Sequence, residues 1–253
     1  MFPQNDELEA YTCLIAGGSR GIGAAIARAV AARGASVIIN YRSSELEALR
    51  LARDLREKGA GVLAIRADLS RENEVERMFT RIEAEMGNVN ALVYNAGVSQ
   101  RGLLIECSEE QWDRVMNANL KGAFLCCRRA LPYMIRERFG RIVNIASVLG
   151  ITGASYESIY SSAKGGLIAL TRSLAQEVGP SGITVNAIAP GPIFTDMLRE
   201  ELDEDEMADL TREIPVGRLG CPEDVAAACV FLLGREASFI NGHILSLDGG
   251  WKP

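Results

Sequence analysis

Three polar side chains in the second half of the chain have the chemistry and spacing for proton transfer to a carbonyl. Tyr160 and Lys164 are four residues apart in a helical pattern, which places both side chains on one face of a helix. A nearby ammonium stabilises a phenolate and lowers a tyrosine pKa from its usual value of about 10. Ser147, which follows an apolar run, adds a second hydroxyl donor. The set predicts an acid that protonates a ketone as a cofactor delivers hydride, although Tyr and Lys at this spacing are also common on solvated helix faces.

Short apolar runs alternate with amphipathic stretches along the whole chain. This alternation predicts βαβ units, and hence an α/β fold with a doubly wound, Rossmann-like parallel sheet and helices on both faces. The seven expected strands are residues 12–16, 37–40, 62–65, 91–94, 141–146, 184–188 and 243–247. The expected helices are residues 22–33, 46–58, 74–86, 110–136, 159–178 and 222–234. A chain of 253 residues without a linker or repeat predicts one domain, residues 11–253, after an N-terminal extension of residues 1–10.

The charge and cysteine content exclude several function classes. A net charge of -6 argues against a nucleic-acid surface. Six cysteines without a CxxC spacing and a single histidine leave no expected metal site and indicate a reducing compartment. The first ten residues do not form a targeting signal, and no apolar run approaches the ~18 residues of a membrane span. We therefore expect a cytoplasmic protein without nucleic-acid or membrane partners.

Arginines gather in one part of the chain, from the second half of the expected fourth helix to the start of the expected fifth strand. A solvated helix face is the favoured interpretation of this cluster, because apolar residues interrupt it with a helical period. A docking surface for an acidic partner is the alternative. The arginines are Arg128, Arg129, Arg136, Arg138 and Arg141.

A glycine-rich stretch follows the first expected strand and opens the first expected helix. It reads Gly17-Gly18-Ser19-Arg20-Gly21-Ile22-Gly23, a GxxxGxG spacing. Glycines let the backbone turn tightly and approach a phosphate, while the helix N-terminus offers unpaired N–H groups. The stretch predicts a site for the pyrophosphate of a dinucleotide, with a plain tight turn as the alternative.

The second expected strand ends in Asn40, Tyr41 and Arg42, without the carboxylate that would hold the ribose hydroxyls of NAD. Arg42 and Arg20 instead suit the additional phosphate of NADP, because a guanidinium grips phosphate with parallel hydrogen bonds. Two solvated surface arginines are the alternative. The sequence favours NADP(H).

Further polar groups stand where the third and fourth strands are expected to end. Asp68-Leu69 and Asn95-Ala96-Gly97 lie at carboxyl ends of strands, where open α/β sheets bind ligands. Asp68 could accept from an adenine amino group or could cap the next helix. Asn119 lies within an expected helix, where it either serves the site or satisfies a neighbouring backbone group.

The sixth expected strand runs into the irregular stretch Pro190-Gly191-Pro192-Ile193-Phe194-Thr195. Its position predicts a loop held against the nicotinamide end of a cofactor. Residues 199–213, acidic and amphipathic, follow it. They predict a mobile flap over the cleft, or else a plain solvated helix.

In combination these motifs resemble the short-chain dehydrogenase/reductases over roughly residues 10 to 250. The shared features are the Gly17 to Gly23 loop, Asp68, Asn95-Ala96-Gly97, Asn119, Ser147, Tyr160, Lys164 and Pro190-Gly191. Within that family the chain is most similar to the 3-oxoacyl-[acyl-carrier-protein] reductases, through residues 19–23, 140–144, 214–218 and 248–250. The resemblance implies NADPH-dependent reduction of a 3-oxoacyl thioester to the 3-hydroxyacyl thioester in fatty-acid synthesis. Another ketone or alcohol substrate (a quinone, sugar or small carbonyl) and a non-catalytic dinucleotide-binding protein are the alternatives.

The resemblance also implies roles for single residues. Tyr160 would be the general acid, Lys164 would tune its pKa and bind the ribose, and Ser147 would orient the carbonyl. Asn119 would complete a proton relay through water. The implied cofactor contacts are Gly17, Ser19, Arg20, Gly21, Ile22, Gly23, Asn40, Tyr41, Arg42, Asp68, Leu69, Asn95, Ala96, Gly97, Tyr160, Lys164, Pro190, Gly191, Ile193 and Thr195. The family further implies the strand order 3-2-1-4-5-6-7 and a homotetramer built through helices 110–136 and 159–178 and the C-terminal strands.

Several positions depart from the family pattern. Ala16 and Tyr94 stand where Thr and Asn are frequent, and we expect neither to alter the catalytic chemistry. Glu157 stands where acyl-carrier reductases commonly have Gln, and its carboxylate would repel an acidic substrate or face solvent. Arg138 suits an acidic acyl carrier protein, whereas Ser181 replaces a second basic residue.

Overall fold

The computed structural model describes residues 8–252. Of the predicted N-terminal extension, residues 1–7 lie outside the described residues, and Leu8 is fully buried. Seven parallel strands form one sheet in the order β3-β2-β1-β4-β5-β6-β7, which confirms the predicted fold class. The strands are β1 (Thr12–Ala16), β2 (Ser36–Tyr41), β3 (Val62–Arg66), β4 (Ala91–Tyr94), β5 (Gly140–Ile145), β6 (Ile183–Pro190) and β7 (Ile244–Leu247). The inner strands are near-continuous apolar runs because helices cover both of their faces.

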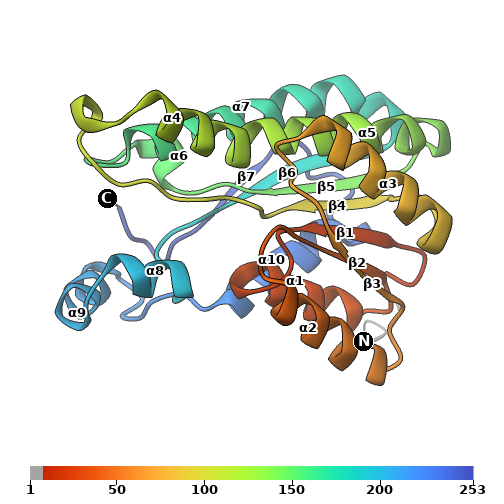
Figure 1. Ribbon diagram of the computed structural model, residues 1–253, viewed down its shortest axis with the longest axis horizontal. Coiled ribbons are helices and arrows are strands. Elements are labelled where there is room, and N and C mark those ends of the chain that lie inside the picture. The colour runs from red at the N-terminus through yellow and green to blue at the C-terminus, as the bar shows by residue number, and fades with distance from the viewer. Residues whose placement is uncertain (1–7, 253) are drawn as a thin grey trace.

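The long helices lie in two layers, one on each face of the sheet (Figure 1). One layer contains α1 (Gly21–Ala31), α2 (Glu45–Glu57) and α10 (Pro222–Leu233). The other contains α3 (Glu72–Met86), α4 (Glu109–Met116), α5 (Gly122–Glu137) and α7 (Ser158–Val178). Each layer buries an apolar stripe against the sheet, which is what amphipathic helices between parallel strands require.

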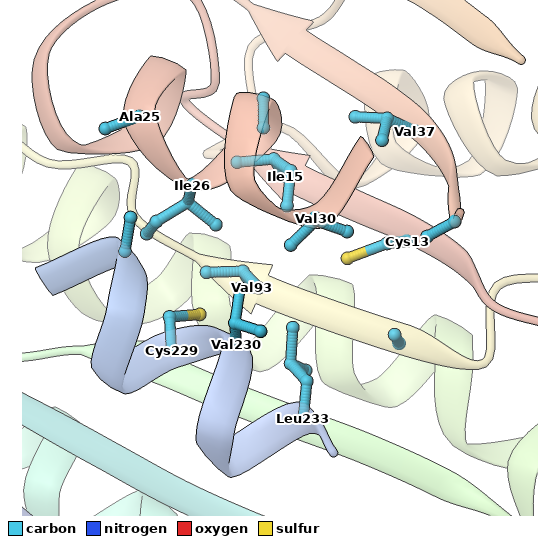
Figure 2. Close-up of a cluster of buried hydrophobic side chains, with 14 of the residues drawn as sticks. Cys13, Ile15, Ala25, Ile26, Val30, Val37, Val93, Cys229, Val230 and Leu233 are labelled. Carbon is cyan, nitrogen blue, oxygen red and sulfur yellow. The ribbon is translucent and has the colours of Figure 1, made fainter. Parts of the chain in front are cut away.

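In the core beneath the first layer, the N-terminal helix α1 packs against the C-terminal helix α10. Ile26 of α1 and Val230 of α10 are buried in the same cluster as Ile15 of β1 and Val93 of β4. Figure 2 shows α10 lying beside α1 across these side chains. The C-terminal helix therefore packs on the first βα unit, and the glycine-rich stretch at the start of α1 is held rigidly against the sheet.

The carboxyl ends of β1 and β4 lie side by side although they are far apart in sequence. Leu14 of β1 pairs with Ile38 of β2 on one side and with Leu92 of β4 on the other. The chain therefore changes direction along the sheet at β1, and the loops after β1 and β4 run to opposite faces. Open parallel sheets bind ligands at such a point, outside the carboxyl ends of the strands.

The predicted helix of residues 110–136 differs most from the structure. It is divided into α4 and α5 by a π-helical turn, η2 (Asn117–Lys121), which contains Asn119. Such turns are rare and are found mostly at functional sites. A short helix, α6 (Leu149–Thr152), also follows β5 and is not among the helices expected from the sequence.

The acidic segment after β6 forms two short helices, α8 (Asp196–Glu201) and α9 (Glu204–Glu213). They stand apart from the layered body beside the C-terminal end of the chain (Figure 1). Asp203 accepts from the backbone of Glu206 while the Glu206 side chain accepts from the backbone of Asp203, so α9 begins at a complete capping box. We call α8 and α9 the lid; its mobility stays a prediction.

Two of the five arginines in the cluster form ion pairs with the neighbouring helix α3. Arg128 forms an ion pair with Glu72 of α3, and Arg129 pairs with Glu76 and Glu83 of the same helix. Arg141 is buried. Within residues 8–252, no helix is long and apolar enough to cross a membrane, and no three His, Cys, Asp or Glu side chains gather where they could hold a metal ion.

Candidate active site

A cavity of about 420 Å³ lies at the carboxyl ends of the strands, bordered by the loops after β1 to β6 and by the lid. The structure brings nearly all of the predicted site residues to this cavity. Its lining includes Gly17, Ser19, Arg20, Gly21, Ile22, Asn40, Tyr41, Arg42, Asp68, Leu69, Asn95, Ala96, Gly97, Asn119, Ser147, Tyr160, Lys164, Pro190, Gly191, Ile193 and Thr195. Gly23 is not among the lining residues.

The glycine-rich loop is held from both sides by amide side chains. The Gly17 N–H donates to Asn40 Oδ1 at 3.2 Å, and Asn95 Nδ2 donates to the Gly17 carbonyl at 2.9 Å. Gly17 has a φ of +70°, a conformation that favours glycine. A side chain on Gly23 would overlap the Gly17 carbonyl oxygen, so Gly23 serves the close packing of loop and helix. This arrangement leaves the first N–H groups of α1 facing the cavity.

Asn40, near the end of β2, bonds to neighbouring backbone groups at the position where a carboxylate would bind the ribose of NAD. Its Nδ2 donates to the Ala67 carbonyl at 3.2 Å, and its own carbonyl accepts from Gly18 at 2.9 Å. The residue is buried, with 2% of its surface exposed. It ties the ends of β1, β2 and β3 together, which fixes the loop that carries Arg42.

The exposed side chains of Arg20 and Arg42 both border this end of the cavity. Arg66 Nε donates to the Arg42 carbonyl at 3.1 Å and holds the loop from the neighbouring strand. Burial alone would raise the pKa of Asp68, but hydrogen bonds from Ser70 and the charge of Arg42 outweigh it and lower that pKa. An anion at this end would therefore meet two arginines and one ionised carboxylate.

Asp68 does not cap the helix that follows it. Its Oδ1 accepts from the backbone N–H of Ser70 at 3.0 Å and from the Ser70 hydroxyl at 2.7 Å. The N-cap position of α3 belongs to Arg71, which makes no side-chain cap. Asp68 thus closes a local turn at the cavity edge.

Lys164 lies almost fully buried, with 3% of its surface exposed. Its ammonium donates to the Ile145 carbonyl at 2.8 Å and lies 5.7 Å from the ring centroid of Tyr160. Burial lowers the pKa of Lys164 from 10.5 to about 8, because the charged form loses its hydration. One of the three ammonium donors is used by Ile145, and the others remain for ligands in the cavity.

Ser147 lies two residues beyond the end of β5 and is mostly buried. Its hydroxyl oxygen accepts from the Leu149 N–H at 3.2 Å at the start of α6. A hydroxyl has one donor and two acceptor positions, so this contact leaves its proton free to donate. Ser147 and Tyr160 both line the cavity, and each carries a hydroxyl group that is able to donate a hydrogen bond.

Asn119 satisfies backbone groups with one end of its amide and faces the site with the other. Its Nδ2 donates to Val98 at 2.8 Å and to Val115 at 3.0 Å. Its buried Oδ1 has no hydrogen-bond partner among the described residues. A Cβ on Gly97 would lie 2.5 Å from this oxygen and 3.5 Å from the Lys164 ammonium. Asn119 therefore satisfies neighbouring backbone groups and also lines the cavity with an acceptor oxygen, while its role in a reaction stays a prediction.

Comparisons with known proteins identify the family to which the chain belongs. Residues 16–252 match the sequence profile of a family described as enoyl-(acyl carrier protein) reductase. A 3-oxoacyl-[acyl-carrier-protein] reductase of Bos taurus is 44% identical over 241 residues, 94% of this chain and 96% of that protein. A Staphylococcus aureus protein of the same name is 37% identical over 239 residues, 94% of this chain and 97% of its own. The chain belongs to the short-chain dehydrogenase/reductase family. A crystal structure of a putative gluconate dehydrogenase from Agrobacterium tumefaciens has a TM-score of 0.93 at 34% identity and covers 98% of both chains.

Short-chain dehydrogenase/reductases are oxidoreductases that use NAD(P)H, and the residues of this cavity fit such a cofactor. Gly17 and Gly21 line the cavity beside the start of α1, and a pyrophosphate fits there because neither residue carries a side chain and a helix N-terminus favours an anion. Gly21 faces Thr195 across the cavity, since a Cβ on Gly21 would lie 3.7 Å from Thr195 Cγ2. Lys164 retains donors for ribose hydroxyls.

Glu157 gives an unexpected result for this short-chain dehydrogenase/reductase. It lines the cavity three residues before Tyr160, yet it is mostly buried and does not face solvent. Its carboxylate forms an ion pair with Arg101, the nearest N and O atoms being 3.4 Å apart. The Gly102 N–H also donates to the Tyr156 carbonyl at 2.9 Å. The charge expected to repel acidic substrates is thus compensated, and two loops are tied together at the cavity edge.

Apolar side chains form a wall of the cavity that the sequence analysis did not identify. Val98 and Leu149 come from the loops after β4 and β5, and Leu198 and Leu210 come from the lid. Trp251 completes the wall, and its Nε1 donates to Glu213 of α9 at 3.1 Å. No local spacing marks these residues, because they meet only when the lid and the C-terminal end come together.

Replacing Lys164 with methionine should reveal the cost of burying its charge. Between pH 8 and 10.5 the unfolded chain binds the lysine proton and the folded chain does not, so the free energy of unfolding of the parent rises with pH. Lys164→Met lacks that rise. The free energy of unfolding of Lys164→Met minus that of the parent should be highest below pH 8. This difference should be about 3 kcal/mol lower above pH 10.5.

Denaturant unfolding at a series of pH values measures this difference. Lys121→Met, the same change at an exposed position, is the matched control and should show no such dependence. A difference between Lys164→Met and the parent that stays constant with pH would contradict burial of the ammonium.

Proposed function

We propose that this short-chain dehydrogenase/reductase reduces 3-oxoacyl thioesters to 3-hydroxyacyl thioesters with NADPH. The observation that carries the proposal is the convergence of Ser147, Tyr160, Lys164 and Asn119 on one cavity. The curated relatives named 3-oxoacyl-[acyl-carrier-protein] reductase support the substrate class. The apolar wall suits an acyl group, because it offers hydrocarbon contacts beside the hydroxyl donors.

The residues of the chain supply the proton side of the reaction. Ser147 and Tyr160 donate hydrogen bonds to the carbonyl oxygen, and negative charge on that oxygen strengthens both bonds. The nicotinamide, when bound, supplies a hydride to the carbonyl carbon. Tyr160 gives its proton to the oxygen, which completes the alcohol. The Lys164 ammonium stabilises the phenolate that remains, and Asn119 Oδ1 accepts from a water that returns a proton toward Lys164.

NADPH is the proposed cofactor because of the charges at the adenosine end. Arg20 and Arg42 border that end, and Asn40, which is occupied by backbone contacts, replaces the carboxylate that would select NAD. Two guanidinium groups at one edge suit a phosphate monoester.

The acyl carrier and the assembly belong to the proposal as well. Arg138, an exposed residue at the C-terminal end of α5, is the proposed docking contact for an acidic acyl carrier protein. Arg128 and Arg129 are not proposed for it, since α3 carboxylates neutralise them. A homotetramer is proposed from exposed apolar side chains on the faces expected to pair. These are Trp112 and Phe124 on α4 and α5, and Phe231 and Phe239 near the C-terminal strand.

A polyhydroxylated carbonyl compound is the second candidate substrate. Glu157 places a carboxylate in the cavity, and a carboxylate accepts hydrogen bonds from hydroxyl groups. The structural similarity to a putative gluconate dehydrogenase points in the same direction.

Replacing Tyr160 with phenylalanine tests the proposed reaction. The rate of NADPH oxidation is measured with acetoacetyl thioesters of coenzyme A and of acyl carrier protein, beside simple ketones and sugars. The variant should lose at least ~100-fold in turnover and keep its affinity for NADPH, because only the acid is removed. Tyr133→Phe on α5 is the control. Unchanged turnover in Tyr160→Phe would refute the mechanism, and activity on free ketones or sugars alone would refute the thioester substrate.

Replacing Arg42 with aspartate tests the cofactor preference. The variant should bind NADPH at least about tenfold more weakly, which is ~1.4 kcal/mol, and should bind NADH no more weakly than the parent. Arg50→Asp makes the same charge change at an exposed position of α2 and should alter neither affinity. Equal affinities of the parent for NADPH and NADH, measured by fluorescence titration, would overturn the assignment.

A further inference from the structure

Tyr94 is the last residue of β4 and is fully buried. Its hydroxyl donates to the Ala118 carbonyl at 2.6 Å, a contact between the sheet and the helical layer above it. Burial holds the pKa of Tyr94 well above its usual value, so the phenol stays neutral and remains a donor. Tyr94 stands where the family frequently has Asn, and the structure shows that its hydroxyl has a specific partner, the Ala118 carbonyl.

That partner lies in the π-helical turn that carries Asn119. The Gly122 N–H donates to the Asn117 carbonyl, five residues back, and not to the Ala118 carbonyl four residues back. The extra residue in the turn interrupts the regular ladder at Ala118. Ala118 is partly buried, and the Tyr94 hydroxyl supplies a donor to the carbonyl that the ladder leaves out.

The fit between Tyr94 and the turn is close. A side chain at position 122 would overlap the Tyr94 hydroxyl oxygen, so only glycine allows the phenol to reach Ala118. Gly122 is the first residue of α5 and is itself buried. The hydroxyl and the glycine therefore form one matched contact at the point where the π turn ends.

The direction of the Asn119 side chain depends on this turn. Residues in an α-helix are about 100° apart around the axis, so a slip of one residue would turn Asn119 away from the cavity. In the observed register, Asn119 Nδ2 donates to the Val98 and Val115 carbonyls. Asn119 Oδ1 and the Lys164 ammonium both lie close to Gly97.

We propose that Tyr94 is a positioning residue for the reaction, whose hydroxyl holds the π turn in the register that aims the Asn119 amide oxygen into the cavity. Tyr94 acts through Asn119 and touches neither the carbonyl nor the proton that moves. This inference rests on the proposed reductase function for its kinetic consequence, and on the contacts of Asn119 for its structural one.

The structural consequence is measured by exchange of side-chain amide protons in nuclear magnetic resonance spectra. In the parent, the Asn119 amide donates to two carbonyls and should exchange slowly. In Tyr94→Phe it should exchange at least about tenfold faster. The buried amide of Asn144, which donates to Thr171 at 2.9 Å, should be unchanged. Equal slow exchange of Asn119 in parent and variant overturns the inference, as does an equal acceleration at Asn144, which would mean general loosening.

The kinetic consequence is measured with the carbonyl substrate that the parent reduces fastest. Tyr94→Phe should lower kcat at least about tenfold, with the affinity for NADPH within about twofold. The double variant Tyr94→Phe/Asn119→Ala should be no slower than Asn119→Ala alone, because both changes remove the same acceptor. Tyr11→Phe, the same change at a buried tyrosine before β1, is the control and should keep full rate.

The two measurements separate the possible failures. A parent that reduces no carbonyl refutes the proposed function, and the exchange measurement then decides the role of Tyr94 alone. With an active parent, full rate in Tyr94→Phe, or losses that add in the double variant, overturns the inference. Should Tyr94→Phe fail to fold, Gly122→Ala replaces it, since the new methyl group displaces the same hydroxyl and should give the same coupling to Asn119.

Discussion

The structure depends on one buried charge, the ammonium of Lys164. Burial in a medium other than water disfavours the charged form of a cation, and the compensation here comes from the Ile145 carbonyl at 2.8 Å and the Tyr160 ring, whose centroid is 5.7 Å away. The end of β5 must therefore lie beside α7, level with Lys164. Pairing with β6 holds β5 in this position, and packing against the sheet holds α7. The same burial lowers the pKa of Lys164 to about 8, so the lysine can release and take up a proton near neutral pH.

Around that charge, each strand end contributes one part of the cavity. The loop after β1 provides backbone N–H groups, the loop after β2 provides arginine, and the loops after β4 and β5 provide an amide and a hydroxyl. Several polar side chains support the loops of the site and are not proposed to take part in the reaction. Asn40 and Asn95 brace the glycine loop, and Glu157 with Arg101 ties two loops at the rim. A parallel sheet can concentrate such groups because all of its strands end at one edge.

Much of this could be predicted from the sequence because the signals are local. Apolar runs of strand length marked all seven strands, and the spacing of Tyr160 and Lys164 along one helix face placed both side chains in the cavity. The π turn at Asn119 could not be predicted in this way. The Ala118 carbonyl in this turn accepts from the hydroxyl of Tyr94, which is 24 residues away in sequence. A regular helical pattern continues through residues 110–136 and conceals the interruption.

Contacts across long sequence separations also explain the other differences. Glu157 was expected to face solvent or repel substrates, but it is mostly buried and forms an ion pair with Arg101, an exposed residue on a loop of another βα unit. The pairing of Arg128 and Arg129 with α3 depends on how two helices lie side by side. The apolar wall needs Trp251 and the lid together. Such features arise from packing, which residue spacing alone does not encode.

Direct titration of Lys164 tests the central claim of this account. The chain has four lysines, so a sample labelled with 15N at the lysine side chains gives a simple nuclear magnetic resonance spectrum, and Lys164→Met assigns the signal of interest. The account predicts that this signal titrates with a pKa of about 8 in the folded protein without cofactor. A pKa at the ordinary lysine value of about 10.4 would contradict it, because the ammonium would then be hydrated and could not organise the site.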